Sequence, residues 1–183
     1  MINFFLTRML QKRVLRKRRT TRLATYMPLT AATDIGLLVN AGDCRAAEAF
    51  QFLRFEFKRM GIRCSYVCAD MRKEPESAPI FSAVPGIIRI DRRNVNWYGV
   101  PDPDATSEFL KTKFDILIDI SSASRLFPLD YLLYCADAKL RIGVAPGPDN
   151  IYDITVWENR EDGSPVPADL LARNIVKYLT TIK

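Results

Sequence analysis

Two continuous apolar runs joined by one helical pattern constrain the fold of this chain more than any other feature. Residues 35–40 (IGLLVN) form an apolar run of strand length, which is typical of a strand buried on both faces. Residues 44–60 repeat apolar side chains at helical spacing, and Gly61 follows them as a helix-ending glycine. A second run of strand length covers residues 62–69. This order predicts a β-α-β unit with parallel strands and a right-handed crossover.

The same alternation continues to the end of the chain. Four further runs predict strands, at residues 86–91, 114–120, 138–144 and 152–157. Three further segments predict helices, at residues 106–113, 129–136 and 166–182. We therefore expect one three-layer, Rossmann-like α/β domain over residues 34–183, in which helices cover both faces of a mostly parallel sheet of about five to six strands.

The positive charge of the chain is concentrated at its N-terminus. Residues 1–22 contain no Asp or Glu and eight of the 27 Lys and Arg residues: Arg8, Lys12, Arg13, Arg16, Lys17, Arg18, Arg19 and Arg22. The rest of the chain holds all 21 acidic residues and is slightly acidic overall. A basic segment on a near-neutral body predicts an anionic partner, either a nucleic acid or a membrane surface.

Residues 1–33 are predicted to form a basic N-terminal helix or arm followed by a linker. Residues 1–10 carry apolar side chains at helical spacing, but Arg13 and Arg16 fall on the same face as Phe5 and Met9. The apolar stretch is shorter than the roughly 20 residues that span a bilayer, and it precedes the positive charge, which is the reverse of a signal peptide. An acid-free leader of this composition also resembles a mitochondrial transit peptide.

The absence of histidine limits the chemistry open to the chain. It excludes Ser-His-Asp and Cys-His catalysis and histidine metal ligands. The cysteines form no pair of Cys-x-x-Cys motifs, and Cys64 and Cys68 would lie roughly 13 Å apart along one strand, too far for a disulfide. We expect free thiols in a reducing compartment, with no metal and no cofactor.

A small-ligand site is predicted where the parallel strands end, because ligands of such sheets bind beyond the carboxyl ends of the strands. The candidate residues lie after the first strand and after the central strand: Gly42, Asp43, Ser121, Ser122, Ser124 and Arg125. Hydroxyls and a guanidinium suit a small anion, although the same hydroxyls also cap turns, and Asp43 also suits the N-cap of the next helix. Glycine-rich nucleotide fingerprints and an evident general base are both absent, so we expect no turnover there.

Two stretches resemble known proteins. The runs FDILIDI at 114–120 and KLRIGV at 139–144 resemble strands in the N-terminal, Rossmann-like half of heptosyltransferase-type glycosyltransferases, whose nucleotide-sugar domain has no counterpart in this sequence. Over its whole length the chain resembles an uncharacterised bacterial family of small proteins, in which a basic N-terminus precedes one Rossmann-like domain. That resemblance implies this fold and a bacterial cytoplasm, and it supplies no activity.

These observations together predict a non-catalytic cytoplasmic module that docks on RNA or a ribonucleoprotein, the ribosome above all, through its basic arm. No recognisable RNA-binding or helix-turn-helix motif accompanies that arm. Two alternatives stay open. One is a small transferase-like enzyme that binds a nucleotide or phosphorylated ligand at the sheet edge, and the other is a peripheral inner-membrane factor held by its amphipathic, basic N-terminus.

Overall fold

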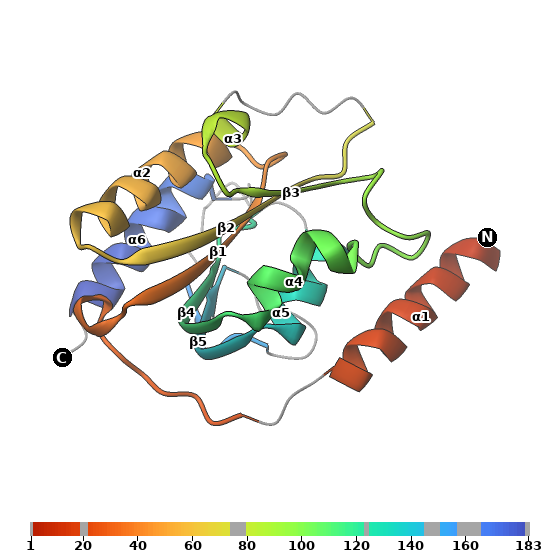
Figure 1. Cartoon of the computed structure of the whole chain (residues 1–183), viewed down its shortest axis with the longest axis horizontal. Helices are drawn as coiled ribbons and strands as arrows, with labels where there is room; N and C mark the ends of the chain where they lie inside the picture. Colours follow the sequence, from red (N-terminus) through yellow and green to blue (C-terminus); the bar gives the residue numbers. More distant parts are fainter. Residues whose placement is uncertain are drawn as a thin grey trace.

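A six-stranded parallel sheet organises the computed structural model, which describes residues 2–18, 22–73, 80–122, 125–144, 151–156 and 166–181 (Figure 1). The strands lie in the order β3-β2-β1-β4-β5-β6, and every neighbouring pair is parallel. Their bounds are β1 Asp34–Asn40, β2 Arg63–Asp70, β3 Ile88–Asp91, β4 Lys113–Asp119, β5 Asp137–Gly143 and β6 Ile154–Thr155. The predicted parallel, Rossmann-like sheet is therefore confirmed.

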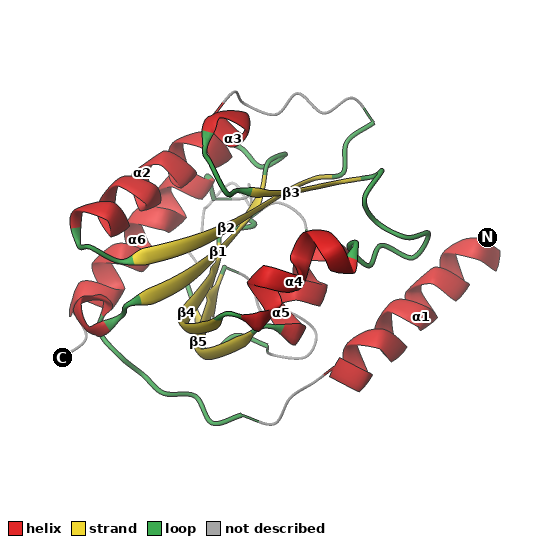
Figure 2. Cartoon of the chain, in the orientation of Figure 1, coloured by secondary structure: helices red, strands yellow, loops and turns green. Residues whose placement is uncertain are grey.

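Helices cover both faces of this sheet, which completes the three layers (Figure 2). One face carries α2 (Ala46–Arg59), α6 (Ala168–Thr181) and the short α3 (Ile80–Ala83). The other carries α4 (Pro103–Lys111) and α5 (Phe127–Cys135). The N-terminal helix α1 (Ile2–Arg18) lies outside α5, and a 3-10 turn, η1 (Leu29–Ala31), leads into β1.

Strand β1 shows how the apolar run builds both halves of the core. Successive side chains of a strand point to opposite faces, so Ile35 and Leu37 join the cluster under α2 and α6, whereas Leu38 joins the cluster under α4 and α5. Gly36 lies directly against side chains of α4 and β4, because a Cβ there would lie 2.7 Å from Cδ1 of Leu117 and 3.2 Å from the Cζ atoms of Phe109 and Phe114. The glycine thus lets the α4 layer pack directly on the strand.

Several predicted boundaries were wrong, each for a local reason. Helix α2 begins at Ala46, and its N-cap is Arg45 in the left-handed region (φ 58°), so Asp43 does not cap it. Helix α4 begins at Pro103 rather than at 106, because the side chain of Asp102 accepts the N–H of Asp104 and a proline suits the first helical position. The segment between β2 and β3, where the sequence predicts no helix, contains α3. The predicted edge strand at 152–157 is reduced to β6, and Trp157 lies outside the described residues.

The N-terminal segment is more ordered than a linker. Helix α1 runs through Arg18, which confirms the predicted N-terminal helix and extends it beyond the apolar stretch of residues 1–10. Downstream of it, the N–H of Thr25 donates to the carbonyl of Lys139 at 3.0 Å, and Leu29 is fully buried in the core. Residues 22–33 therefore lie along the body as a docked strap, which holds the start of β1.

Candidate nucleic-acid interface

Helix α1 docks on the domain through one stripe of its surface. The half-buried side chains Leu10, Gln11, Val14 and Leu15 recur at helical spacing. Val14 and Leu15 pack against the apolar cluster that includes α5, and Nε2 of Gln11 donates to the carbonyl of Tyr98 at 2.9 Å. Apolar contact and a hydrogen bond between distant parts of the chain thus set which side of α1 faces outward.

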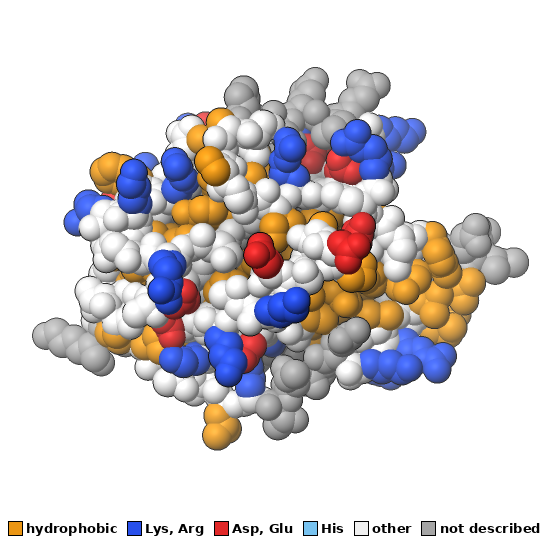
Figure 3. All heavy atoms as spheres, in the orientation of Figure 1, with side chains coloured by type: hydrophobic (Ala, Val, Ile, Leu, Met, Phe, Trp, Pro, Cys, Tyr) orange, Lys and Arg blue, Asp and Glu red, His pale blue; other side chains and the backbone are white. Residues whose placement is uncertain are grey.

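The outward side of the C-terminal half of α1 is basic. Its exposed members are Lys12, Arg13, Arg16 and Lys17; we call these four the α1 basic cluster. Helix α1 contains no acidic residue, and among the described residues no acidic side chain forms an ion pair with any of the four. Figure 3 shows Lys and Arg side chains gathered over this end of the helix. Arg8 is exposed about two turns from Arg16 on the same helix.

The other predicted arm residues differ from this cluster. The side chain of Arg18 and the whole of Arg19 lie outside the described residues. Arg22 is engaged with the body: its Nη2 lies 2.5 Å from Oδ2 of Asp153, and its Nη1 donates to the carbonyl of Lys139 at 3.0 Å. Arg22 therefore holds the docked strap, residues 22–33, against the domain beside β5.

Three apolar side chains are exposed on the N-terminal half of α1. Phe5 keeps 75% of its surface accessible and Met9 49%, and Leu6 is exposed beside them. In Figure 3 an orange area adjoins the blue one over α1, so apolar and cationic surfaces are neighbours on the same helix. Among the described helices, none has both the length and the hydropathy needed to cross a membrane.

The predicted ligand residues at the sheet edge meet at the point where the strand order reverses. Strand β1 lies between β2 and β4, and the chain leaves β1 and β4 toward opposite faces. Asp43 joins the two loops there: its Oδ1 accepts from Nδ2 of Asn40 at 2.8 Å, and its Oδ2 accepts the N–H of Ser122 at 2.5 Å. Oδ1 of Asn40 in turn accepts the N–H of Gly42 at 3.0 Å. The carboxylate of Asp43 thus accepts hydrogen bonds from donors that an anionic ligand at this place would need.

Arg125 does not converge with Gly42 and Asp43 but turns toward β6. Its guanidinium pairs with the carboxylate of Asp130 and lies 5.5 Å from the centre of the Tyr152 ring. The hydroxyl of Tyr152 donates to Oδ2 of Asp119 at 2.6 Å, and burial together with this carboxylate raises the pKa of Tyr152 far above its ordinary value. Tyr152 therefore stays protonated as a structural donor.

Ser121 and Ser124 complete the set of sheet-edge predictions. The backbone N–H of Ser121 donates to Oδ1 of Asp119 at 2.9 Å, while its buried Oγ has no hydrogen-bond partner in the described structure. Ser124 lies outside the described residues. The sequence predicts that these residues lie around one small anion. Among those described, the observed contact is the one between Asp43 and Ser122.

The cysteines and acidic residues form no reactive centre among the described residues. All four cysteines are free thiols. Burial raises the pKa of Cys64 to about 11 and that of Cys68 to about 12, so neither is a ready thiolate. Within the described ranges no three Cys, Asp or Glu side chains lie close enough together to hold a metal ion.

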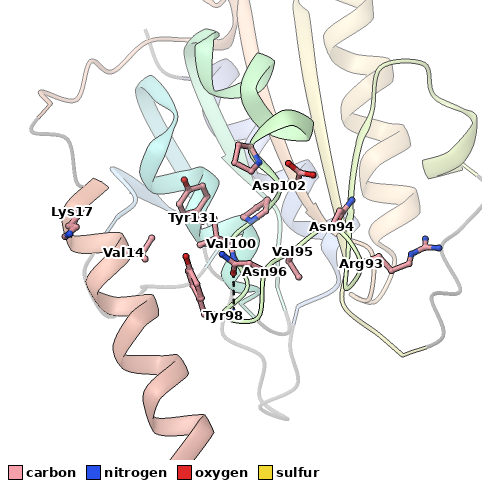
Figure 4. A pocket seen from close by; sticks show the side chains of 12 residues that line it. Val14, Lys17, Arg93, Asn94, Val95, Asn96, Tyr98, Val100, Asp102 and Tyr131 are labelled. Atoms are coloured by element: carbon pink, nitrogen blue, oxygen red, sulfur yellow. Dashed lines mark hydrogen bonds between the residues drawn. The ribbon is translucent and has the colours of Figure 1, made fainter.

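A cavity that sequence reasoning missed lies between α1 and the loop after β3 (Figure 4). It has a volume of about 570 Å³ and is walled by Val14 and Lys17 of α1, by nine of the residues between 93 and 103, and by Tyr131 of α5. The sequence shows turn residues and two aromatic side chains in this loop, but nothing in it indicates that α1 packs opposite. The cavity exists only because the two distant segments meet.

Comparison with known proteins identifies the family. A model described as a family of unknown function, DUF6913, matches residues 3–182. The chain belongs to this family. Comparison with curated proteins found no match. The predicted resemblance to an uncharacterised family is thereby confirmed, and because the DUF6913 match covers α1 as well as the sheet, the basic helix belongs to the region that defines the family.

In this DUF6913 protein the exposed side of α1 and the sheet edge differ in character. The α1 basic cluster is exposed and forms no ion pair among the described residues, whereas at the edge Asp119 and Asp43 accept the backbone N–H groups of Ser121 and Ser122. The chemistry available at α1 is electrostatic binding, and it needs no reacting group.

Proposed function

We propose that this DUF6913 protein is a non-catalytic module that docks on RNA, either bare or within a ribonucleoprotein such as the ribosome, through the exposed basic side of α1. The observation that carries the proposal is the α1 basic cluster, four exposed cations on a helix that is anchored to the domain. Phosphate groups attract such cations and release counterions when they bind, which supplies affinity without sequence readout.

The anchoring of α1 strengthens the proposal. A docked helix presents its cations at fixed spacing, so less conformational entropy is lost on binding than for a flexible basic tail. The hydrogen bond from Gln11 to the carbonyl of Tyr98 and the packing of Val14 provide this preorganisation. The proposal includes a bacterial cytoplasmic location, in keeping with the four free thiols.

The transferase-like alternative has no comparable support. It requires an open anion site at the carboxyl end of the sheet, and the carboxylate of Asp43 takes the N–H of Ser122 at that place. Its candidate cation, Arg125, is paired with Asp130 through Nε and Nη2, and only its buried Nη1 has no hydrogen-bond partner in the described structure. We therefore assign the contact between Asp43 and Ser122 a structural role and propose no reaction there.

The test compares two variants with equal loss of charge. The first changes Lys12, Arg13, Arg16 and Lys17 to Gln. The matched control changes four exposed lysines on other elements to Gln: Lys58, Lys111, Lys113 and Lys177. In fluorescence anisotropy with labelled RNA, the first variant is expected to lose binding and the control to keep most of it. Equal losses in the two variants would show that net charge, and not the α1 surface, drives binding.

A second candidate, a peripheral inner-membrane factor, is favoured by the exposed Phe5, Leu6 and Met9 beside the basic cluster. Apolar side chains that enter the lipid boundary next to cations that meet anionic headgroups are typical of interfacial helices. Co-sedimentation with anionic vesicles separates the two functions. If Phe5→Asp abolishes vesicle binding and RNA does not bind, the membrane function replaces the RNA function.

A further inference from the structure

The cavity beside α1 has the size of a small-molecule site. Its volume of about 570 Å³ falls within the roughly 300–1,000 Å³ typical of ligand pockets. It is bounded on one side by α1, on the other by a small hairpin, and at its base by Tyr131 of α5 (Figure 4).

The hairpin wall is built by backbone pairing. Val95 and Pro101 form an antiparallel bridge, the N–H of Asn96 donates to the carbonyl of Val100 at 2.9 Å, and the N–H of Asp102 donates to the carbonyl of Asn94 at 2.9 Å. Because side chains alternate along paired strands, Asn94, Asn96, Val100 and Asp102 share one side of the hairpin. All four line the cavity, and the bridged pair Val95 and Pro101 lines it as well.

The cavity walls combine flat apolar surface with polar groups. Tyr98, Tyr131, Val14 and Val100 contribute rings and methyl groups. Oδ1 of Asn96 accepts the N–H groups of Tyr98 and Val100, which fixes the amide so that its Nδ2 is left as a donor. Asp102 uses Oδ1 to cap α4, which leaves Oδ2 as an acceptor.

One cation stands at the rim on the α1 side. Lys17 lines the cavity and also belongs to the α1 basic cluster, so an anionic group bound there lies on the same helix that we propose for RNA. Arg93 lines the opposite rim but is paired with Asp91, with Nη2 and Oδ2 2.6 Å apart, and Figure 4 shows it directed away from α1. The cavity therefore offers one available positive charge beside apolar rings and hydrogen-bonding groups.

We propose that this cavity takes one unpaired nucleotide, with its base against the tyrosine and valine walls and its phosphate at Lys17. The inference rests on the proposed RNA function and makes it more specific, since a base held in a duplex cannot enter a cavity. Aromatic surface suits the face of any base, and the amide of Asn96 and the carboxylate of Asp102 suit its polar edge. A free nucleoside monophosphate carries the same chemistry and is distinguished by the test.

The first experiment compares two labelled RNAs of equal length, a hairpin with an unpaired loop and a blunt duplex, on the full chain. Tighter binding of the loop RNA is expected. Lys17→Ala should lower the affinity for the loop RNA about tenfold more than Lys12→Ala does, because Lys12 lies on the same helix but outside this cavity. The two variants should lower the affinity for the duplex equally. Asp102→Asn keeps a good N-cap for α4 and should reduce the loop preference without lowering the melting temperature.

The second experiment needs no RNA. Trp97 is 66% exposed and lies edge-on to Tyr98, with the ring centres 5.2 Å apart, so its fluorescence reports on ligands beside Tyr98. In a Trp157→Phe background it is the single tryptophan. Saturable quenching is expected with nucleoside monophosphates and not with inorganic phosphate or ribose 5-phosphate.

The outcomes separate this inference from the proposed function. Equal affinity for loop and duplex RNA, with equal effects of Lys17→Ala and Lys12→Ala, overturns the cavity inference and leaves RNA docking intact. Quenching by nucleoside monophosphates without any RNA binding overturns RNA docking and supports the cavity as a site for the free nucleotide. Absence of both RNA binding and quenching overturns both.

Discussion

Oδ2 of Asp43 lies 2.5 Å from the backbone nitrogen of Ser122, which ties the turn after β1 to the loop after β4. The same carboxylate accepts the amide of Asn40 through Oδ1. In an open parallel sheet these two loops normally flank a ligand crevice. Here the carboxylate of Asp43 holds the two loops together and stabilises this part of the sheet edge.

The first prediction concerns this contact. Asp43→Ala removes the acceptor of the buried Asn40 amide and of the half-buried N–H of Ser122, which typically costs about 1–3 kcal/mol. Urea denaturation should show a lower midpoint for this variant with an unchanged slope. Asp104→Ala is the control, because that carboxylate is exposed. A midpoint equal to that of the wild type would mean that the two loops do not depend on Asp43.

The second prediction concerns the core under α2. The sequence predicts that Phe50, Leu53 and Phe57 are buried, and all three are fully buried. Leu53→Ala should therefore cost about 2–5 kcal/mol of unfolding free energy. Phe55→Ala on the same helix removes a larger side chain that is 65% exposed, and its cost should stay below about 0.5 kcal/mol. Similar costs for the two variants would show that the buried face of α2 is assigned wrongly.

The sequence predicts the existence and the buried face of α2 because apolar side chains recur at helical spacing where the helix packs on the sheet. This pattern can be recognised in a single sequence. The cap of α2 was not predictable in the same way. Asp43 has the right residue type and position for an N-cap, but it bonds to Ser122, 79 residues away, and Arg45 takes the cap position. Local propensity cannot reveal a tertiary contact that uses the same side chain.

The cavity beside α1 and the ion pair of Arg22 could not be predicted for the same reason, because both depend on contacts between distant parts of the chain. Gln11 and Tyr98 are 87 residues apart, and Arg22 and Asp153 are 131 apart. A run of basic residues looks uniform in sequence, yet the fold leaves Lys12 and Arg16 exposed and ties Arg22 to the body. Composition therefore predicts an anionic partner, but only the packing shows which cations are available to it.

The third prediction is a pH dependence centred on Asp115. Burial by itself would raise the pKa of Asp115, but hydrogen bonds from Lys139 at 2.8 Å and from Thr33 hold it well below the ordinary value. A lowered folded-state pKa stabilises the fold above the ordinary aspartate pKa of about 3.9, and this contribution disappears as the pH falls toward the folded-state value. The wild-type melting temperature should therefore drop on acidification from about pH 5.

Comparison with Asp115→Asn isolates this contribution. The variant should be less stable at neutral pH, and its melting temperature should fall less steeply below about pH 5, because the titrating carboxylate is gone. Asp137→Asn, at an exposed position on the neighbouring strand β5, should follow the wild-type curve. Parallel curves for Asp115→Asn and the wild type would contradict the role assigned to Asp115.

The fourth prediction concerns the docking of α1. Val14 packs against the apolar cluster of α5, so Val14→Asp should detach the helix and leave the sheet folded. Limited proteolysis with trypsin should then cut within the α1 basic cluster faster than in the wild type, while the circular dichroism of the domain changes little. Met9→Asp, at an exposed position of the same helix, should show wild-type cleavage rates. Equal rates for the two variants would mean that α1 does not depend on Val14.

The last prediction is the salt dependence of RNA binding. If the α1 basic cluster neutralises four phosphates, the logarithm of the association constant should fall with the logarithm of salt concentration at a slope of roughly −3, since each contact on a single strand contributes about −0.7. Removing one cation, as in Arg13→Gln, should reduce the slope by about 0.7. Arg22→Gln removes the same charge from a side chain that is bonded to Asp153, and should leave the slope unchanged while it lowers stability. A slope that responds equally to Arg13→Gln and Arg22→Gln would place the phosphate contacts beyond α1, on the strap as well.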